Sequence, residues 1–327
     1  MKGTFELPED WKEMSVALQV YSSLSEWDNT TNPQMKVSLN GNYIQAIDVN
    51  HREVRLDPSE LTGTIALQID IFSGREEKKF PLYVNLLAID PIVEQVWFDF
   101  STIFDSWRAI RKFGGEEQIY QSCLSQAANA LDFRAPYTPR FYEGLTNAQE
   151  CLQACYSQEI RQKVTAVGHT HIDLAWLWTA QQAVEKGERS FQTVLKLMDE
   201  YPEYTFLQSQ PQLYQAIKEQ YPELYQAIKE KIKSGRWEVE GAMWVEADCN
   251  LTSGESLVRQ ILYGKRFIKE EFDHDSQILW LPDVFGYSAA LPQILQKTNT
   301  PYFMTTKLSW NQFNQIPYDS FYWQGID

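Results

Sequence analysis

Two histidines and an aspartate are spaced two residues apart in the stretch VTAVGHTHIDLAWLW, from Val164 to Trp178. In an extended chain, residues two apart point to the same side, so His169, His171 and Asp173 can face one point. Imidazole nitrogen and carboxylate oxygen are ligands that zinc accepts. A hydrogen-bonded histidine pair in a surface loop is the alternative, but the chain has only 4 histidines in 327 residues. The spacing at the end of an apolar run therefore favours a metal site.

Polar residues also follow three later apolar runs. Glu246 and Asp248 come after RWEVEGAMW. Asp283 comes directly after ILWLP, and Lys307 comes after YFMTT. Because loops at the carboxyl ends of parallel strands converge on one face, these side chains are expected near the histidines. A carboxylate at Asp283 could ligate the same metal, attack a substrate carbon, or do both.

Two tryptophans, Trp176 and Trp178, follow the histidine motif at once. An indole face offers apolar area that suits the apolar face of a sugar ring. Two tryptophans alone would more often belong to a core. Beside a metal site, Trp176 is predicted to stack on the substrate.

These residues must be positioned by an α/β unit that begins at residue 161. Strand-like runs, namely VTAVG, YTFLQSQ, RWEVEGAMW, QILWLP and PYFMTT, alternate there with helical runs. The helical run GESLVRQILYGKRFIKEEF begins with Thr252 and Glu255 at capping-box spacing. Regular alternation predicts a parallel sheet over 161–327, either open or closed into a barrel.

Residues 1–90 have the pattern of a β-sandwich. MKVSLNGNYIQAIDV places Asn40-Gly41 between two alternating strands, which is a strong hairpin signal. TGTIALQIDIF alternates apolar residues from Ile65 to Ile71 on one face.

Residues 91–160 have helical spacing and are predicted to form a connector. IVEQVWFDFSTIFDSWRAIRKFGG spaces its apolar residues by three and four and stops at Gly114-Gly115. Its aromatic stripe is interpreted as core packing, and it consists of Trp97, Phe98, Phe100, Phe104 and Trp107. The fold class is thus a multi-domain protein with a sandwich, a helical connector and an α/β parallel sheet.

Composition excludes some partners. The formal net charge of −15 argues against nucleic acid, because phosphates are bound by basic surfaces. The sequence has neither an 18-residue apolar run nor the apolar core of a signal peptide at its start. We therefore expect a cytoplasmic protein that does not bind a membrane, in an oligomeric state left open, with a homo-oligomer included.

These motifs resemble those of a known family. GHTHIDLAWLW together with WLPDVFGYSAALPQI resembles glycoside hydrolase family 38, the retaining zinc-dependent α-mannosidases. GRWEVEGAMWVEADCNLTSGESLVRQ and TTKLSWNQFNQIPYDSFYWQGID are similar to its bacterial and cytosolic branch. The resemblance is strong from about residue 160 to residue 327, and the region before it resembles the segments that precede the catalytic domain.

The resemblance implies a role for each motif residue. His171 and Asp173 match the first two zinc ligands, and Asp283 matches the residue that both ligates zinc and acts as nucleophile. Trp176 matches the tryptophan under the mannose ring. His169 matches a supporting histidine, and Lys307 matches a basic residue close to the nucleophile. Asp248 matches an acidic residue near the pocket.

The implied reaction is hydrolysis of terminal α-mannosides, as found in α-mannoside oligosaccharides, with one zinc ion. In such enzymes zinc binds the vicinal 2- and 3-hydroxyls of mannose, and the nucleophile forms a covalent glycosyl-enzyme. The family's last zinc histidine and its acid/base aspartate lie beyond residue 327. A barrel of roughly 250 residues would also need more chain than follows residue 161. We therefore expect an N-terminal portion that does not turn over substrate alone.

Two other functions remain open. A metal-dependent amidohydrolase or deacetylase also carries His-x-His after its first barrel strand, but it needs further histidines after later strands, which this sequence almost lacks. A non-catalytic carbohydrate-binding fragment, with the sandwich holding the sugar, is the third hypothesis.

Overall fold

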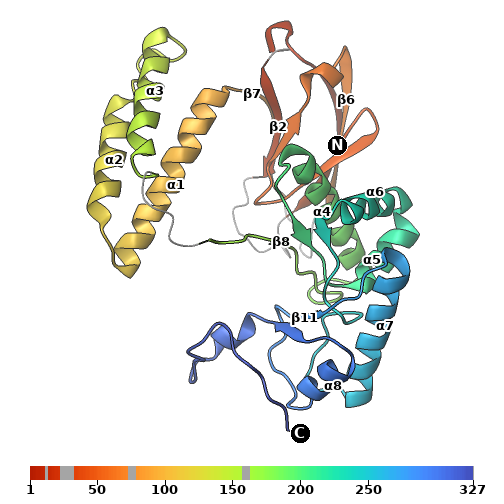
Figure 1. The fold of residues 1–327 in the computed structure, drawn as a ribbon. Coiled ribbons are helices and arrows are strands. Elements are labelled where there is room, and N and C mark those ends of the chain that lie inside the picture. The colour runs from red at the N-terminus through yellow and green to blue at the C-terminus, as the bar shows by residue number, and fades with distance from the viewer. Residues whose placement is uncertain (12–13, 23–32, 73–78, 157–162, 327) are drawn as a thin grey trace.

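The structure is a computed structural model that describes residues 1–11, 14–22, 33–72, 79–156 and 163–326. The N-terminal part contains strands in two antiparallel sheets, of order β1-β6-β3-β4 and β5-β2-β7 (Figure 1). The strands are β1 (Lys2–Glu6), β2 (Ser15–Ser22), β3 (Gln34–Leu39), β4 (Asn42–Ile47), β5 (Glu53–Leu56), β6 (Thr64–Phe72) and β7 (Leu82–Ile89). Buried side chains from both sheets share one hydrophobic core, so the sheets pack face to face. We call β1–β7 the N-terminal sandwich.

The sequence pattern explains most of this sandwich. The hairpin of β3 and β4 turns at Asn40 and Gly41, with φ angles of 51° and 85°. Two positive φ angles are those of the two-residue turn that Asn-Gly favours, so the predicted hairpin is confirmed. Ile65 and Ile69 are buried as predicted. Ile71 is 39% exposed, because β6 runs past the shared core near its end.

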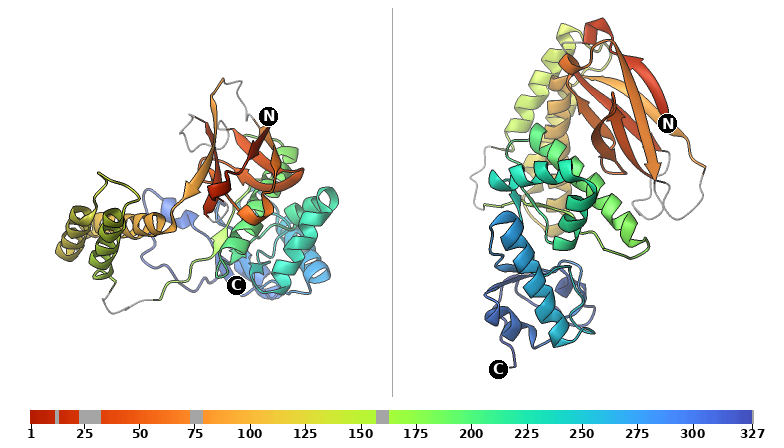
Figure 2. Two further views of the ribbon diagram at one scale, coloured as in Figure 1. Left: turned by 90° about the horizontal axis from the view of Figure 1, so that it is seen from above. Right: turned by 90° about the vertical axis from the view of Figure 1, so that its right-hand side faces the viewer.

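Three helices follow the sandwich and pack around a core of their own. They are α1 (Pro91–Phe113), α2 (Glu117–Ala130) and α3 (Pro139–Gln153). The Asp90 carboxylate accepts the N–H groups of Ile92 and Val93 at the start of α1, and the helix ends before Gly114, with φ of 86°. Figures 1 and 2 show this three-helix unit to one side of the rest of the molecule.

The aromatic stripe of α1 is core only in part: Phe100 and Trp107 pack against the helical core, as predicted, and the other three residues do not. Trp97, Phe98 and Phe104 are 61%, 49% and 40% exposed. The face that the helix turns toward α2 and α3 also carries the buried residues Val96 and Ile103. Two neighbouring helices cover only one face of a long helix, and the sequence cannot tell which apolar face that is.

The rest of the chain alternates short strands with helices. These elements are β8 (Gly168–His169), α4 (Ala180–Glu200), β9 (Phe206–Leu207), α5 (Pro211–Gln220), α6 (Pro222–Lys233), β10 (Trp237–Glu238), α7 (Gly254–Phe272), β11 (Ile278–Trp280), α8 (Leu291–Lys297) and β12 (Tyr302–Met304). The pairs β8–β9, β9–β10 and β11–β12 are parallel, and a parallel bridge between Gly241 and Leu279 links the segment after β10 to β11. The described strands β8 to β12 therefore lie beside one another in chain order. The barrel and the domain boundaries stay predictions.

Two local predictions for this part are wrong. The run VTAVG is not a strand before Gly168, and Val164 is 84% exposed, since β8 pairs through Gly168 and His169 alone. The N-cap of α7 is Ser253, whose hydroxyl accepts the N–H of Ser256. The hydroxyl of Thr252 instead donates to the Asp248 carbonyl.

The sandwich joins the α/β part through α4, which packs against β4. An Arg189 guanidinium N–H donates to the Gln34 side chain at 2.6 Å. Lys36 of β3 forms an ion pair with Glu188 of α4. Among the helices of the described ranges, none is both long and apolar enough to cross a membrane.

Candidate metal centre

The carboxyl ends of β8 and β11 bring three candidate ligands together. The Nε2 atom of His171 lies 3.4 Å from an Asp173 carboxylate oxygen and 3.4 Å from an Asp283 carboxylate oxygen. Ligand atoms of the three residues all lie within 4.8 Å of one another. Residues 110 positions apart thus share one site, because parallel strands end at the same edge of their sheets.

The other nitrogen of His171 is held by a buried carboxylate. The Nδ1 atom hydrogen-bonds to Glu246, whose side chain is only 4% exposed. The Ser209 hydroxyl donates to the second Glu246 oxygen at 2.6 Å. A carboxylate on Nδ1 favours the tautomer with the proton on Nδ1, which leaves the Nε2 lone pair facing Asp173 and Asp283.

The electrostatic surroundings of His171 are strongly negative. Burial by itself lowers the pKa of His171, but the carboxylates of Asp173 and Glu246 outweigh burial and raise the pKa to about 10. The same surroundings favour a cation at Nε2. A proton and a metal ion compete for that nitrogen, because only neutral imidazole is a ligand.

Two buried glutamines hold the loop that carries His171. The side-chain amide of Gln208 donates to the Thr170 carbonyl at 3.3 Å, and that of Gln210 donates to the Ile172 carbonyl at 2.8 Å. Both side chains belong to residues at most 2% exposed. The backbone is thus fixed on either side of His171.

The sequence predicted that Glu246 lies near the histidines, and the structure confirms this, but Gln208 and Gln210 were not predicted to take part in the site. A signal existed, because the polar run QSQ directly follows the buried strand β9 and precedes the proline that starts α5. Polar side chains in such a place must find hydrogen-bond partners.

Asp283 has a second polar neighbour. Lys307, at the carboxyl end of β12, forms an ion pair with the Asp283 oxygen Oδ1, while Oδ2 faces His171. The Lys307 side chain is 9% exposed, and its ammonium lies 3.3 Å from the ring centre of Trp310 and 4.7 Å from that of Phe285. Aromatic faces on the ammonium restrict it to this position.

His169 lies beside the cluster and outside it. Its Nε2 is 3.8 Å from Glu246, and its ring centre lies 5.3 Å from that of Trp280. Burial, with a smaller contribution from His171, lowers the pKa of His169 against the opposing effect of Glu246. The residue is therefore placed as a neutral neighbour of the His171–Glu246 pair.

The two remaining candidates lie at the surface. Trp176 is 60% exposed and meets Trp178 edge to face, with ring centres 5.2 Å apart. The Trp178 indole N–H donates to the Asp173 carbonyl at 2.9 Å, which holds this pair beside the loop that carries Asp173. Asp248 is exposed, and its carboxylate accepts the N–H groups of the two residues Asn250 and Leu251. The structure does not bring Asp248 into the cluster.

The three residues fit a divalent cation. The buried Nε2 of His171 has no hydrogen-bond partner in the described part of the chain. A nitrogen lone pair that faces two carboxylates is electrostatically unfavourable unless a positive charge lies between them. One imidazole nitrogen and two carboxylate oxygens are a donor set that zinc accepts, with positions left for further ligands.

Comparison with known proteins adds independent information. The model of the N-terminal domain of glycosyl hydrolases family 38 matches residues 161–327. Alpha-mannosidase G of Dictyostelium discoideum is 51% identical over 172 residues, and the match covers 53% of this chain and 16% of that protein. Human alpha-mannosidase 2C1 is 46% identical over 169 residues, with 52% and 16% covered. The chain therefore spans only about a sixth of the length of these relatives.

Among solved structures, an alpha-mannosidase from Enterococcus faecalis V583 is similar. It is 26% identical with a TM-score of 0.40, and the match covers 42% of this chain and 16% of that one.

Proposed function

The chain belongs to glycosyl hydrolases family 38, as its motifs predicted, and on this premise we propose that it acts in a retaining, zinc-dependent α-mannosidase. The substrates would be terminal α-mannosides of oligosaccharides in the cytoplasm. The observation that carries the proposal is the approach of His171, Asp173 and Asp283 to one point from two strand ends.

His171, Asp173 and Asp283 would hold the metal. Zinc, when bound, would supply a Lewis-acidic centre that orients vicinal sugar hydroxyls. Glu246 would act as a positioning residue, since its carboxylate fixes the tautomer and the ring of His171. His169 would support this pair from the side.

Asp283 would act as the nucleophile on the anomeric carbon and form the covalent glycosyl-enzyme. Its ion pair with Lys307 supports this role, because the neighbouring ammonium fixes the orientation of the carboxylate. Trp176 would present its exposed indole face to the sugar ring. The acid/base carboxylate and a further zinc ligand are not assigned to any described residue, and we expect them elsewhere in the complete enzyme.

The test is hydrolysis of an aryl α-mannoside by the complete protein, with an aryl β-mannoside and an N-acetylated substrate for comparison. We expect activity on the α-mannoside alone, a product of retained configuration, loss of activity with a chelator and recovery with zinc. Asp283→Asn should lower kcat/KM by roughly 10³-fold or more. The matched control is Asp273→Asn, at an exposed position at the end of α7. Full activity of Asp283→Asn, or preference for the N-acetylated substrate, would refute the proposal.

A further inference from the structure

A small aromatic pocket lies at helix α7, which Figure 1 shows on the outer side of the α/β part. The pocket has a volume of about 240 Å³ and is lined by five residues, Trp244, Tyr263, Arg266, Phe267 and Glu270. Four of them belong to α7 and are spaced three or four positions apart, so they share one face of the helix. None of the five is a candidate ligand of the metal centre.

The inner wall of this pocket is aromatic and held in place. Phe267 is 9% exposed and Trp244 is half-buried, and both pack against the core of the α/β part. Their rings meet edge to face with centres 5.6 Å apart. The Trp244 indole N–H donates to the Gln212 side chain at 2.7 Å, and its main-chain N–H donates to the Gln260 carbonyl at 2.9 Å. A ligand that packs on this wall therefore loses little affinity to the ordering of side chains.

The rim of the pocket carries two exposed side chains of opposite charge, Arg266 and Glu270. Glu270 forms neither an ion pair nor a hydrogen bond with the described residues. The Arg266 guanidinium lies 5.4 Å from the ring centre of Tyr263, a contact that leaves its N–H groups without an acceptor in the described part of the chain. The Tyr263 hydroxyl itself is already used, because it interacts with Arg259. The rim thus offers one set of donors and one set of acceptors, with no net charge.

These groups match a neutral sugar ring. One face of a pyranose ring consists of C–H groups, which suit the apolar surface of an aromatic wall. Each sugar hydroxyl both donates and accepts, so neighbouring hydroxyls can bind a carboxylate and a guanidinium at once. An ion of either sign would be repelled by one of the two rim charges, and an apolar side chain would use the aromatic wall alone. The volume lies below the roughly 300–1,000 Å³ of drug-sized ligand sites, which leaves room for a single ring.

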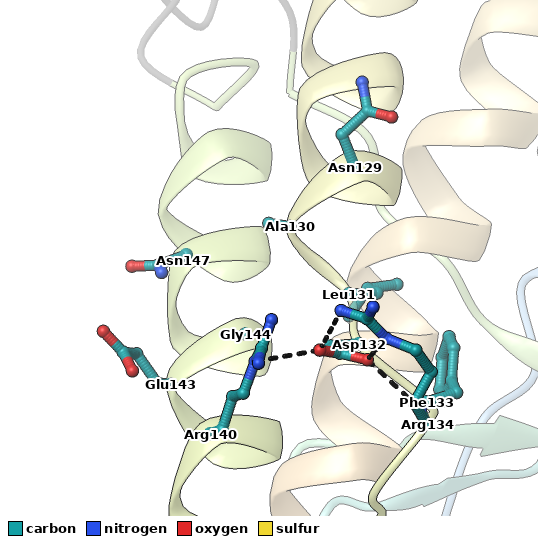
Figure 3. A pocket seen from close by; sticks show the side chains of 10 residues that line it. All are labelled: Asn129, Ala130, Leu131, Asp132, Phe133, Arg134, Arg140, Glu143, Gly144 and Asn147. Carbon is teal, nitrogen blue, oxygen red and sulfur yellow. Dashed lines mark hydrogen bonds and ion pairs between the residues drawn. The ribbon is translucent and has the colours of Figure 1, made fainter.

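A larger hollow of the molecule lacks this combination. The space of about 630 Å³ between α2 and α3 is lined by Arg134 and Arg140, which are both ion-paired with Asp132 (Figure 3). Phe133 is the one aromatic residue among its described lining residues, and it is 65% exposed. The pocket at α7 differs from this hollow by its buried aromatic wall and by a carboxylate that has no partner.

We propose that the pocket at α7 binds one neutral hexopyranose unit of an oligosaccharide, outside the metal centre. Trp244 and Phe267 contact the apolar face of the ring. Glu270 accepts hydrogen bonds from two neighbouring hydroxyls, and Arg266 donates to their oxygens. The pocket holds the sugar and cleaves no bond. That this sugar belongs to the substrate of the metal centre rests on the proposed function, whereas binding of the sugar itself does not.

The test is a saturation-transfer NMR titration of the complete protein with methyl β-glucoside, mannitol and p-cresol. Methyl β-glucoside has equatorial ring hydroxyls and therefore apolar ring faces. It is not an α-mannoside, so its binding reports on this pocket even if the proposed hydrolysis is wrong. We expect saturable binding with a Kd of about 1 mM, as suits a ligand of this size. Mannitol, which has the hydroxyls but no ring, should not bind.

Three outcomes of this titration overturn the proposal. They are the absence of saturable glucoside binding, equal binding of mannitol, and binding of p-cresol without binding of the glucoside. The last of these would identify a pocket for an apolar side chain of a partner protein.

Variants locate the binding. Trp244→Leu and Glu270→Ala should each weaken glucoside binding about tenfold or more. Glu223→Ala, at an exposed glutamate in the first turn of α6, removes the same charge away from the pocket and should leave binding unchanged. Because Trp244 is half-buried, its variant can fail to fold, and Glu270→Ala then decides. Unchanged affinity in Glu270→Ala, or loss of binding in Asp283→Asn, would overturn the assignment.

Discussion

At the scale of single residues, the two nitrogens of His171 have different surroundings. Nδ1 is bound by the buried Glu246, and Nε2 faces two carboxylates. The proposed ligand geometry thus depends on a residue that would not itself touch the metal. We predict that Glu246→Gln lowers zinc affinity about 10–100-fold, because an amide is a weaker acceptor for the imidazole N–H. Competition titration with a zinc chelator measures this change.

The matched control for this substitution is Glu238→Gln. Glu238 lies in β10, on the same segment of chain, but it is exposed. Its variant should bind zinc like the unchanged protein. If Glu246→Gln retained full zinc affinity while remaining folded, the positioning role of Glu246 would be wrong.

The side chains of Asp48 and His51 form a pair whose contribution to stability depends on pH. Hydrogen bonding to Asp48 raises the pKa of His51 above 6.5, although burial opposes it. Burial would raise the pKa of Asp48, but His51 lowers it below 3.8. The His51 contribution to stability is complete below pH 6.5 and is lost as pH rises through the raised pKa. The Asp48 contribution is complete above pH 3.8 and is lost as pH falls through the lowered pKa.

The pair therefore stabilises the fold most between these two values. Since the His51 side chain is 43% exposed, we expect only about 0.5 kcal/mol. Urea unfolding of the unchanged protein and of His51→Gln at about pH 5 and about pH 9 tests this. The stability difference should be larger at the lower pH, and a difference independent of pH would contradict the prediction.

The sequence predicted that His171, Asp173 and Asp283 lie together, because these residues sit at strand ends, where the topology of a parallel sheet brings them to one edge. It did not reach Gln208 or Gln210, since nothing in the sequence says which backbone carbonyl a buried amide will meet. Asp248 shows the opposite case. It follows the same apolar run as Glu246, yet the chain turns and its carboxylate binds the backbone N–H groups of the next turn.

At the scale of elements, helix α7 packs tightly against the segment that follows β10. A Cβ atom placed on Gly264 would lie 2.3 Å from the Ala242 carbonyl oxygen and 2.5 Å from the Met243 carbonyl carbon. Both are backbone atoms of a buried segment and cannot move alone. We predict that Gly264→Ala destabilises the protein by about 3 kcal/mol, as measured by urea unfolding. The displaced segment leads into Glu246, so zinc affinity should fall as well.

The same helix supplies the control for this substitution. A Cβ atom on Gly254, at the start of α7, would meet nothing within 4 Å. Gly254→Ala should therefore leave stability within about 0.5 kcal/mol of the unchanged protein or raise it slightly. Equal effects of the two substitutions would show that close packing at Gly264 is not what holds α7.

Element types were more predictable than their packing. The Asn40-Gly41 hairpin and the helix end at Gly114 depend on local backbone preferences, which a short stretch of sequence contains. The buried face of α1 and the length of β8 depend on neighbours that are distant in the chain. For that reason Trp97 was predicted as core and is exposed.

At the scale of the whole molecule, α4 joins the N-terminal sandwich to the α/β part. Helix α4 packs against β4 of the sandwich, and its buried residues also belong to the core beneath β9 and β10. A change at the sandwich face of α4 is therefore expected to affect the unit that carries the candidate metal centre. The ion pair of Lys36 and Glu188 is one charged contact at this junction.

Substitutions at Lys36 and Glu188 measure how much this ion pair contributes to stability. The Lys36 and Glu188 side chains are 17% and 5% exposed, and burial raises the pKa of Glu188 although Lys36 lowers it. Lys36→Met leaves the carboxylate buried without its cation, so we expect a loss of about 3 kcal/mol in urea unfolding. Replacing both, Lys36→Met with Glu188→Leu, should recover most of that stability, because the carboxylate that lost its cation is removed as well. The control Lys233→Met breaks an exposed pair with Glu230 and should change stability by less than about 0.5 kcal/mol. A double variant no more stable than the single one would mean that the loss arises from missing packing and not from the stranded charge.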